Sequence, residues 1–154
     1  ALYLMKVEML QQQHDISQAC NILVALYKKD PSNLLVKISL AELILSTPNN
    51  GAWLKTLLGM TDNIENDSPV HTVLLFYRGM VLKEMKLYDA AQSILSAAGR
   101  KKKDRDPELL LAIQEERAEI YELQGQKSSA RKIWEKIYAE DPSHPEALRK
   151  INLL

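Results

Sequence analysis

Residues 111–144 have the sequence LAIQEERAEIYELQGQKSSARKIWEKIYAEDPSH, and this stretch decides the fold. Apolar residues recur on both sides of Gly125 at the spacing of an amphipathic helix. Glycine favours a left-handed helix end and proline cannot continue a helix, so Gly125 ends the first predicted helix and Asp141-Pro142 ends the second. The stretch therefore predicts two antiparallel helices joined by a short turn, and it contains no recognisable catalytic pattern.

The same alternation of helical stretches and breaks extends along the whole chain. All six prolines fall between apolar-periodic stretches, and strand-length runs of Val, Ile and Thr are absent. Asp15, Ser68 and Asp106 are placed to cap the helices that follow them, whereas Gly99 is expected to end its helix in a left-handed conformation. We expect helices over residues 2–13, 16–29, 33–46, 52–60, 69–85, 90–98, 107–124 and 128–141, and a short last helix over 146–153.

Small and large side chains are also spaced regularly. Ala118 is followed by Tyr121, and Ala130 is followed by Trp134 and then by Pro142. This spacing resembles the tetratricopeptide repeat (TPR), a unit of about 34 residues with a small residue and an aromatic in its first helix, and an alanine, a large aromatic and a closing proline in or after its second. The resemblance implies an all-α fold, a right-handed superhelical stack of antiparallel helical hairpins.

The resemblance covers almost the whole chain, with four hairpins over about 1–33, 34–71, 72–110 and 111–144 and a capping segment over 145–154. The fourth hairpin matches best, and the second departs most, because Trp53 stands where a small residue is expected. Small residues allow two helices to approach closely. We therefore expect Gly79, Ala91 and Ala130 to lie where a bulky neighbour such as Leu95 or Trp134 fits.

Composition limits the possible functions. The 154 residues suit one domain, and 20 Lys+Arg balance 20 Asp+Glu, so no overall field attracts nucleic acid or an anionic membrane. A single cysteine, Cys20, excludes an internal disulfide and is expected to be a small buried hydrophobe. No leader or membrane-spanning run is evident, and Ala1 already starts a helical pattern. We expect a soluble, cytoplasmic chain that is a piece of a longer protein, without membrane insertion.

The TPR resemblance implies a binding surface, because the first helices of successive hairpins line a concave groove in such arrays. The candidate groove residues are Glu8, Gln12, Glu42, Phe76, Tyr77, Met80, Lys83, Glu115, Glu116, Glu119 and Glu122. They predict an acidic groove with an aromatic centre, suited to a peptide or helix of a protein partner that carries basic charge. The alternative interpretation is a solvated helix face, partly neutralised by Arg78 or Lys83 of the preceding hairpin.

Other chemistry is not indicated. The basic segment over residues 100–105 suits either phosphate contact or a solvated loop, and without neighbouring aromatics we expect no nucleic-acid binding. His14, His71 and His144 are far apart in sequence, and no metal spacing, cofactor motif or nucleophile-base pair emerges. We expect a non-enzymatic protein-protein interaction scaffold. The alternative is a structural or self-association module that packs through residues 34–45 or 151–154 against another copy or domain.

Overall fold

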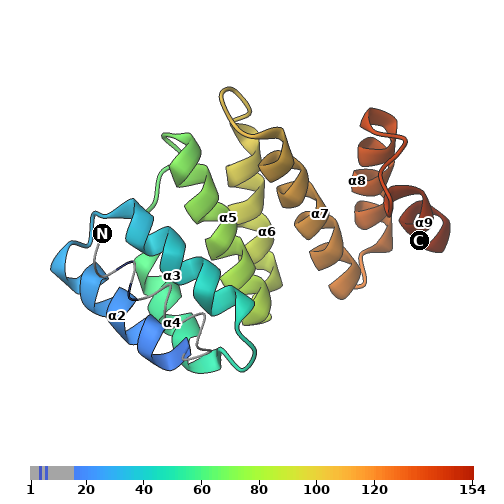
Figure 1. Ribbon diagram of the computed structural model, residues 1–154. Coiled ribbons are helices and arrows are strands. Elements are labelled where there is room, and N and C mark those ends of the chain that lie inside the picture. The colour runs from blue at the N-terminus through green and yellow to red at the C-terminus, as the bar shows by residue number, and fades with distance from the viewer. Residues whose placement is uncertain (1–3, 5, 7–15) are drawn as a thin grey trace. The chain divides into compact units, whose positions relative to one another are not determined.

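The computed structural model describes Leu4, Lys6 and residues 16–154, and these described residues contain helices and connecting turns without a strand (Figure 1). Apart from Leu4 and Lys6, the predicted helix over 2–13 lies outside the described residues. The predicted site residues Glu8 and Gln12 and the predicted cap Asp15 therefore also lie outside them. The helices are α2 (Ile16–Lys29), α3 (Leu34–Ser46), α4 (Gly51–Met60), α5 (Pro69–Glu84), α6 (Tyr88–Arg100), α7 (Pro107–Leu123), α8 (Lys127–Glu140) and α9 (Ala147–Leu153).

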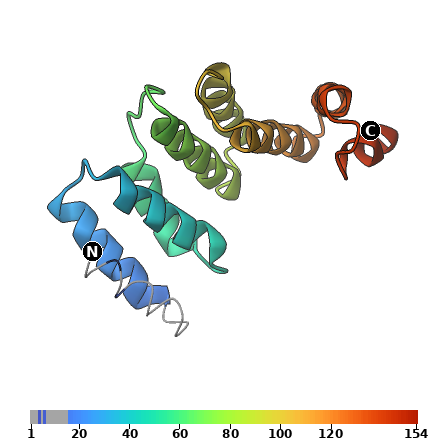
Figure 2. The same cartoon turned by 45° about the horizontal axis from the view of Figure 1, so that its top comes forward.

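Contacts between helices divide the chain into two compact units, Ala1–Ile64 and Glu65–Leu154. In the first unit α3 packs against both α2 and α4 (Figure 2). α4 turns Leu54, Leu57 and Met60 into the core while Trp53 stays half-buried. The substitution of Trp53 for the small residue of the repeat is therefore accommodated by a different buried face on this helix.

Capping side chains set the starts of the long helices in the second unit. The Ser68 side chain accepts a hydrogen bond from the His71 backbone N–H, and that of Asp106 accepts one from Glu108. Pro69 and Pro107 follow directly as first helical residues, where a missing N–H removes no intrahelical bond. Both starts confirm the predictions from the sequence.

One turn motif ends both first helices, α5 and α7. Gly125 has φ +74°, its N–H binds the Glu122 carbonyl, and the next N–H binds the Tyr121 carbonyl. Lys86 has φ 62° and occupies the equivalent place after α5, with the same pair of bonds to Lys83 and Leu82. This is the Schellman helix end, formed by glycine in one hairpin and by lysine in the other.

Small residues produce close packing inside the second unit. A Cβ on Gly79 would lie 2.5 Å from Leu95 Cδ2, so the absence of a side chain in α5 makes room for Leu95 of α6. The predicted pairing of these two positions is confirmed. In the next hairpin Trp134 and Ile137 form a buried cluster with Ala118 and Ala147, so α9 closes the core at the end of α8.

Gly99 does not end α6 in a left-handed conformation, and that prediction was wrong. The helix continues to Arg100, and Gly99 is buried within it. A Cβ there would lie 3.1 Å from Gln114 Nε2 and 3.4 Å from Ile113 Cγ2. The glycine therefore serves the close approach of α6 to α7 rather than a turn.

Candidate functional site

Lys83 joins the first helices of the two hairpins in the second unit. Its Nζ donates to Glu116 Oε2 at 2.7 Å and to Glu119 Oε2 at 3.1 Å. Lys83 belongs to α5 and both glutamates belong to α7, and the lysine and Glu116 side chains are mostly buried. Predicted site residues from two separate stretches of sequence thus meet in one ion cluster, and the predicted neutralisation by Lys83 takes place.

Burial and charge oppose each other in this cluster. Desolvation disfavours the charged form of Lys83, but the hydrogen bonds and charges of Glu116 and Glu119 outweigh it and hold the Lys83 pKa above its usual value. Desolvation raises the pKa of Glu116, helped by the neighbouring carboxylates and opposed by Lys83. One ammonium group is thus shared by two carboxylates, and the Glu119 side chain is the more exposed of the two, at 41%.

An apolar stripe that leads to Lys83 continues this surface along α5. Phe76, Met80 and Lys83 follow each other at helical i, i+4 and i+7 positions and share one side of the helix. Phe76 and Tyr77 have ring centroids 5.9 Å apart, and both rings are half-buried. The stripe of α5 and the carboxylates of α7 therefore meet at Lys83. We call this surface, Phe76, Met80, Lys83, Glu115, Glu116 and Glu119, the α5–α7 face.

Glu122, at the end of the acidic stripe, holds the helices of the last hairpin together. Its Oε2 accepts a hydrogen bond from Trp134 Nε1 at 3.3 Å, and its Oε1 pairs with Lys150 Nζ at 2.8 Å. The Lys150 ammonium group also lies 6.0 Å from the centre of the Trp134 ring. This carboxylate thus connects α7, α8 and α9, which leaves it little capacity for a partner.

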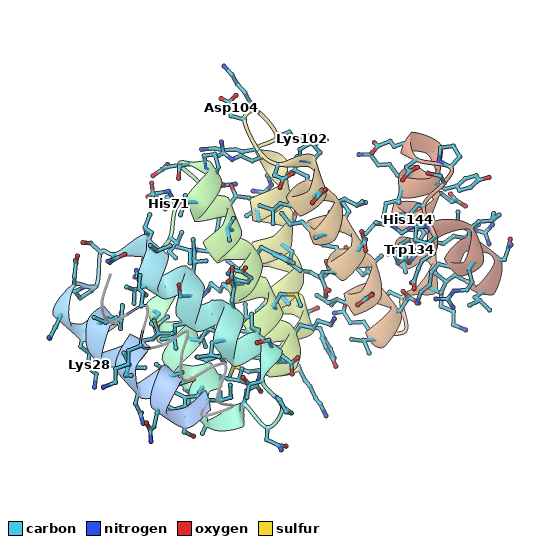
Figure 3. All side chains as sticks on the ribbon, viewed as in Figure 1. Lys28, His71, Lys102, Asp104, Trp134 and His144 are labelled. Carbon is cyan, nitrogen blue, oxygen red and sulfur yellow. The ribbon has the colours of Figure 1, made fainter. Side chains whose placement is uncertain are left out.

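Glu115 faces the segment that precedes α9. His144 Nδ1 accepts the backbone N–H groups of Glu146 and Ala147, so its ring proton belongs on Nε2, which lies 3.5 Å from Glu115 Oε1. The ring also lies beside Trp134 with centroids 5.9 Å apart, and Figure 3 shows the two side chains together. The Glu115 side chain remains 36% exposed, so Glu115 and Glu119 are the accessible carboxylates of the face.

The remaining predicted site residues are not part of this arrangement. Glu42 is an exposed residue of α3 in the first unit, and Glu8 and Gln12 lie outside the described residues. A single groove that includes residues of both units stays a prediction.

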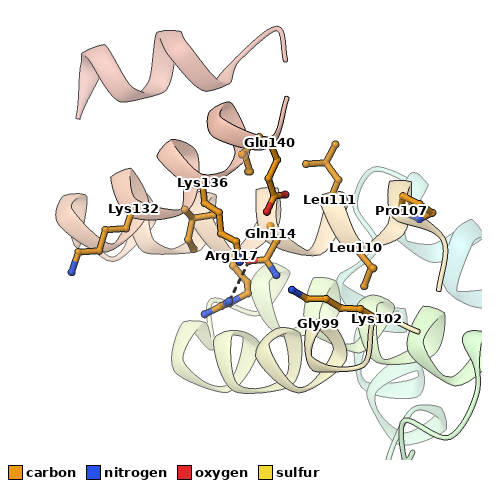
Figure 4. Close-up of a pocket in the computed structure, with 12 residues that line it drawn as sticks. Gly99, Lys102, Pro107, Leu110, Leu111, Gln114, Arg117, Lys132, Lys136 and Glu140 are labelled. Carbon is orange, nitrogen blue, oxygen red and sulfur yellow. Dashed lines mark hydrogen bonds between the residues drawn. The ribbon is translucent and has the colours of Figure 1, made fainter. Parts of the chain in front are cut away.

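A second surface, which the sequence analysis missed, lies between α7, α8 and the end of α6 (Figure 4). It is a groove of about 470 Å³. Its lining residues are Gly99, Lys102, Pro107, Leu110, Leu111, Gln114, Arg117, Lys132, Ile133, Lys136, Ile137 and Glu140. The sequence signal for this groove was the helical spacing of Leu110, Gln114 and Arg117. That spacing indicates a site only once α8 is known to pack beside it with Lys132 and Lys136.

The basic segment over residues 100–105 divides into two parts. Lys101, Lys102 and Lys103 are exposed, and Figure 3 shows the loop projecting at Lys102 and Asp104. Arg105 instead donates from Nε to Thr72 Oγ1 at 3.0 Å and from Nη2 to the Asn66 carbonyl at 3.2 Å. The solvated-loop interpretation therefore does not hold for Arg105, which ties the loop to the start of α5.

Metal and membrane signatures are missing from the residues that the structure describes. Within them, no group of three or more His, Cys, Asp or Glu side chains is placed to hold a metal ion. In the same part of the chain, every helix is too short or too polar to cross a membrane.

Comparisons with known proteins identify the fold. No family model matches the sequence, and a search of curated proteins finds no match. Among solved structures, the crystal structure of MamA protein matches with a TM-score of 0.71 and 17% identity, covering 99% of this chain and 78% of that one. TTC0263, a thermophilic TPR protein in Thermus thermophilus, matches with a TM-score of 0.69 and 18% identity, covering 96% and 78%.

A second MamA crystal structure matches similarly, with a TM-score of 0.70 and 17% identity over 96% of this chain and 81% of that one. The chain therefore has an all-α, TPR-like solenoid fold. At this level of identity the likeness concerns the fold alone, so the function has to be argued from the chain's own surfaces.

Proposed function

We propose that this chain is a non-enzymatic protein-interaction scaffold that binds a peptide or helix of a partner protein on the α5–α7 face. The observation that carries the proposal is the bridge from Lys83 to Glu116 and Glu119 at 2.7 and 3.1 Å. This bridge joins the apolar stripe of α5 to the carboxylates of α7.

The chemistry of the face favours a partner segment that is basic and carries an apolar side chain. Glu115 and Glu119 are the accessible carboxylates, and Lys83 neutralises only part of the negative charge beside them. Phe76 and Met80 offer partly exposed apolar surface next to this charge. Aromatic and apolar anchors supply much of the energy at protein interfaces, while charge complementarity selects the partner and speeds association.

A charge-reversal experiment tests the proposal. A phage-displayed library of 12-residue peptides is selected on the wild-type chain, and the affinities of the enriched peptides are then measured by fluorescence anisotropy. We expect enrichment of basic peptides with an aromatic or aliphatic residue. Glu115→Lys/Glu119→Lys should weaken their binding at least tenfold, which corresponds to about 1.4 kcal/mol.

The matched control is Glu65→Lys/Glu135→Lys, which reverses two exposed carboxylates outside the α5–α7 face and should leave the affinity within a factor of two. Unchanged binding by Glu115→Lys/Glu119→Lys, or the same loss in both double variants, would reject the α5–α7 face as the binding site.

Self-association is the second candidate function. Exposed leucines favour it: Leu35 of α3 is 59% exposed and Leu153 of α9 is 66% exposed. Sedimentation velocity over a concentration series distinguishes the two functions. A dimer that Leu35→Asn or Leu153→Asn abolishes supports this candidate, whereas a monomer at all concentrations excludes it.

A further inference from the structure

The groove between α7 and α8 lies on the side of α7 that faces away from the acidic residues. With about 100° of rotation per residue in a helix, Leu110, Gln114 and Arg117 share one side of α7, and Glu115 and Glu119 lie roughly opposite. The two surfaces therefore use the same helix without sharing a side chain. Figure 4 shows Arg117 and Gln114 of α7 near Lys136 of α8, with Lys132 farther along that helix.

The floor of the groove is apolar. Leu111 and Ile133 pack against the cluster formed by Trp134 and Ile137, so their outer surfaces are fixed by the core beneath them. Leu110 adds a half-buried side chain at the α6 end. A volume of about 470 Å³ falls within the range of about 300–1,000 Å³ that is usual for ligand pockets, and it suffices for one or two large apolar side chains.

The rim of the groove is basic. Lys102, Arg117, Lys132 and Lys136 surround the floor, and Glu140 is the single carboxylate in the lining. Within the described part of the chain, none of the four cations forms an ion pair. Arg117 donates only to the neutral side chains of Gln92 and Gln114, at 3.4 and 3.3 Å.

We propose that this groove is a second docking site, which binds an acidic amphipathic segment of a partner protein. The apolar floor receives the segment's large apolar side chains, and the four rim cations pair with its carboxylates. From Lys132 to Glu140 the lining follows α8 for about 12 Å at about 1.5 Å per residue, which matches roughly two turns of a bound helix.

The lining argues for a peptide rather than a nucleic acid. Nucleic-acid surfaces stack bases on aromatic side chains, and the lining contains no aromatic residue. Helix-in-groove recognition instead needs apolar anchors with charges at the rim, and both are present. The predicted ligand has the opposite charge from the one proposed for the α5–α7 face, so either site can fail without affecting the other.

Designed peptides test the proposal. The probes are labelled 12-residue helix-forming peptides with Leu or Phe at i and i+4 and Glu at the flanking positions, compared with the same peptides carrying Lys in place of Glu. We expect the wild-type chain to bind the acidic set, with an affinity that decreases as salt increases, because exposed charge pairs are screened. Lys132→Glu/Lys136→Glu should weaken binding at least tenfold.

Two further variants separate the site from general effects of charge. Leu110→Asn removes apolar floor without changing charge and should also weaken binding, whereas Lys55→Glu/Lys127→Glu reverses two exposed lysines elsewhere and should bind as the wild type does. Circular dichroism identifies any variant that fails to fold. If Lys132→Glu/Lys136→Glu does not fold, the peptide affinity of Leu110→Asn tests the site in its place.

Three outcomes would overturn the proposal. One is equal binding of the acidic and basic peptide sets by the wild type, and a second is equal binding of the acidic set by Lys132→Glu/Lys136→Glu. The third is a different occupant of the groove. Single-stranded RNA or anionic vesicles that bind in place of the peptides would show this, and so would a concentration-dependent dimer in sedimentation. In each case the binding would be abolished by Lys132→Glu/Lys136→Glu.

Discussion

Replacing Gly79 with alanine tests how closely α5 and α6 pack. The added Cβ would lie 2.5 Å from Leu95 Cδ2 and 2.6 Å from Leu95 Cγ, whereas carbon atoms in contact are usually about 3.5–4.0 Å apart. Rotation about χ2 can move the methyl groups of Leu95 but leaves Cγ in place, and rotation about χ1 is restricted because the side chain is fully buried. The two helices therefore have to separate by about 1 Å, the shortfall in this contact distance.

Two opposing terms determine the free-energy change. Overpacking of a buried site costs about 1–3 kcal/mol, and Leu95 is fully buried. Alanine in a helix interior is worth about 0.5–1 kcal/mol over glycine. Since the clash involves Cγ, we expect overpacking to prevail and Gly79→Ala to lower the free energy of unfolding by about 1–2 kcal/mol.

Urea denaturation measures the effect. In a Trp53→Phe background the remaining tryptophan, Trp134, reports on the second unit, which contains Gly79. Gly59→Ala is the control, since α4 has open space around that Cβ. It lies in the first unit, so its unfolding is followed by far-UV circular dichroism, and it should be neutral or stabilising by up to about 1 kcal/mol. In the double variant with Leu95→Ala, the clash disappears and the loss should be smaller than the sum of the single losses. A Gly79→Ala chain as stable as wild type, without coupling to Leu95, would refute the packing argument.

Further predictions concern helix ends and the ion cluster. Both positions have left-handed backbone, which glycine adopts more easily than other residues. In urea denaturation, Lys86→Gly should therefore stabilise the chain by about 0.5–1 kcal/mol and Gly125→Ala should destabilise it by about 1 kcal/mol. A change of the same sign in both variants would contradict this. Lys83→Met should cost about 1–3 kcal/mol at pH 7, since it leaves the mostly buried Glu116 carboxylate unpaired, and thermal melts that coincide with wild type would argue against the bridge. The raised Glu116 pKa means that the folded chain binds this proton more tightly than the unfolded one. Lowering the pH from 7 to 5 should therefore stabilise wild type relative to Glu116→Gln. A free energy of unfolding that falls in wild type relative to this variant, measured by urea titration, would mean that the Glu116 pKa is lowered instead.

Local signals in the sequence predict most helix starts and ends. Ser68-Pro69 and Asp106-Pro107 start helices because a cap and a first-turn proline act within a few residues of each other. Gly125 ends α7 for an equally local reason. The close pairing of Gly79 with Leu95 was predictable from the spacing of small and large residues within one hairpin. Each of these features depends on neighbours that are close along the chain.

Features that depend on the next helix in space were not predictable. A glycine near a helix end can serve either as a left-handed cap or as a point of close contact with another helix. At Gly99 it is the contact, because Gln114 of α7 packs against this position. The acidic stripe of α7 could be read from the sequence, but its partners His144 and Lys150 lie beyond Pro142 and reach it only through the packing of α9 on α8.

The basic-rimmed groove was missed for the same physical reason. Its lining combines the end of α6 with one side each of α7 and α8, and each of these sides alone resembles an ordinary solvated helix surface. Charge and apolar surface become a site only when the three helices are brought together.

Photo-crosslinking tests the central claim, that a partner segment binds on the α5–α7 face, most directly. A photo-reactive amino acid replaces Met80 on this face, or Glu135 on the exposed side of α8, in the protein expressed in its own cells. We predict a covalent adduct with a partner polypeptide from position 80 that disappears in the Glu115→Lys/Glu119→Lys background, and no such adduct from position 135. The same adduct from both positions, or an adduct at position 80 that persists after the charge reversal, would contradict the account.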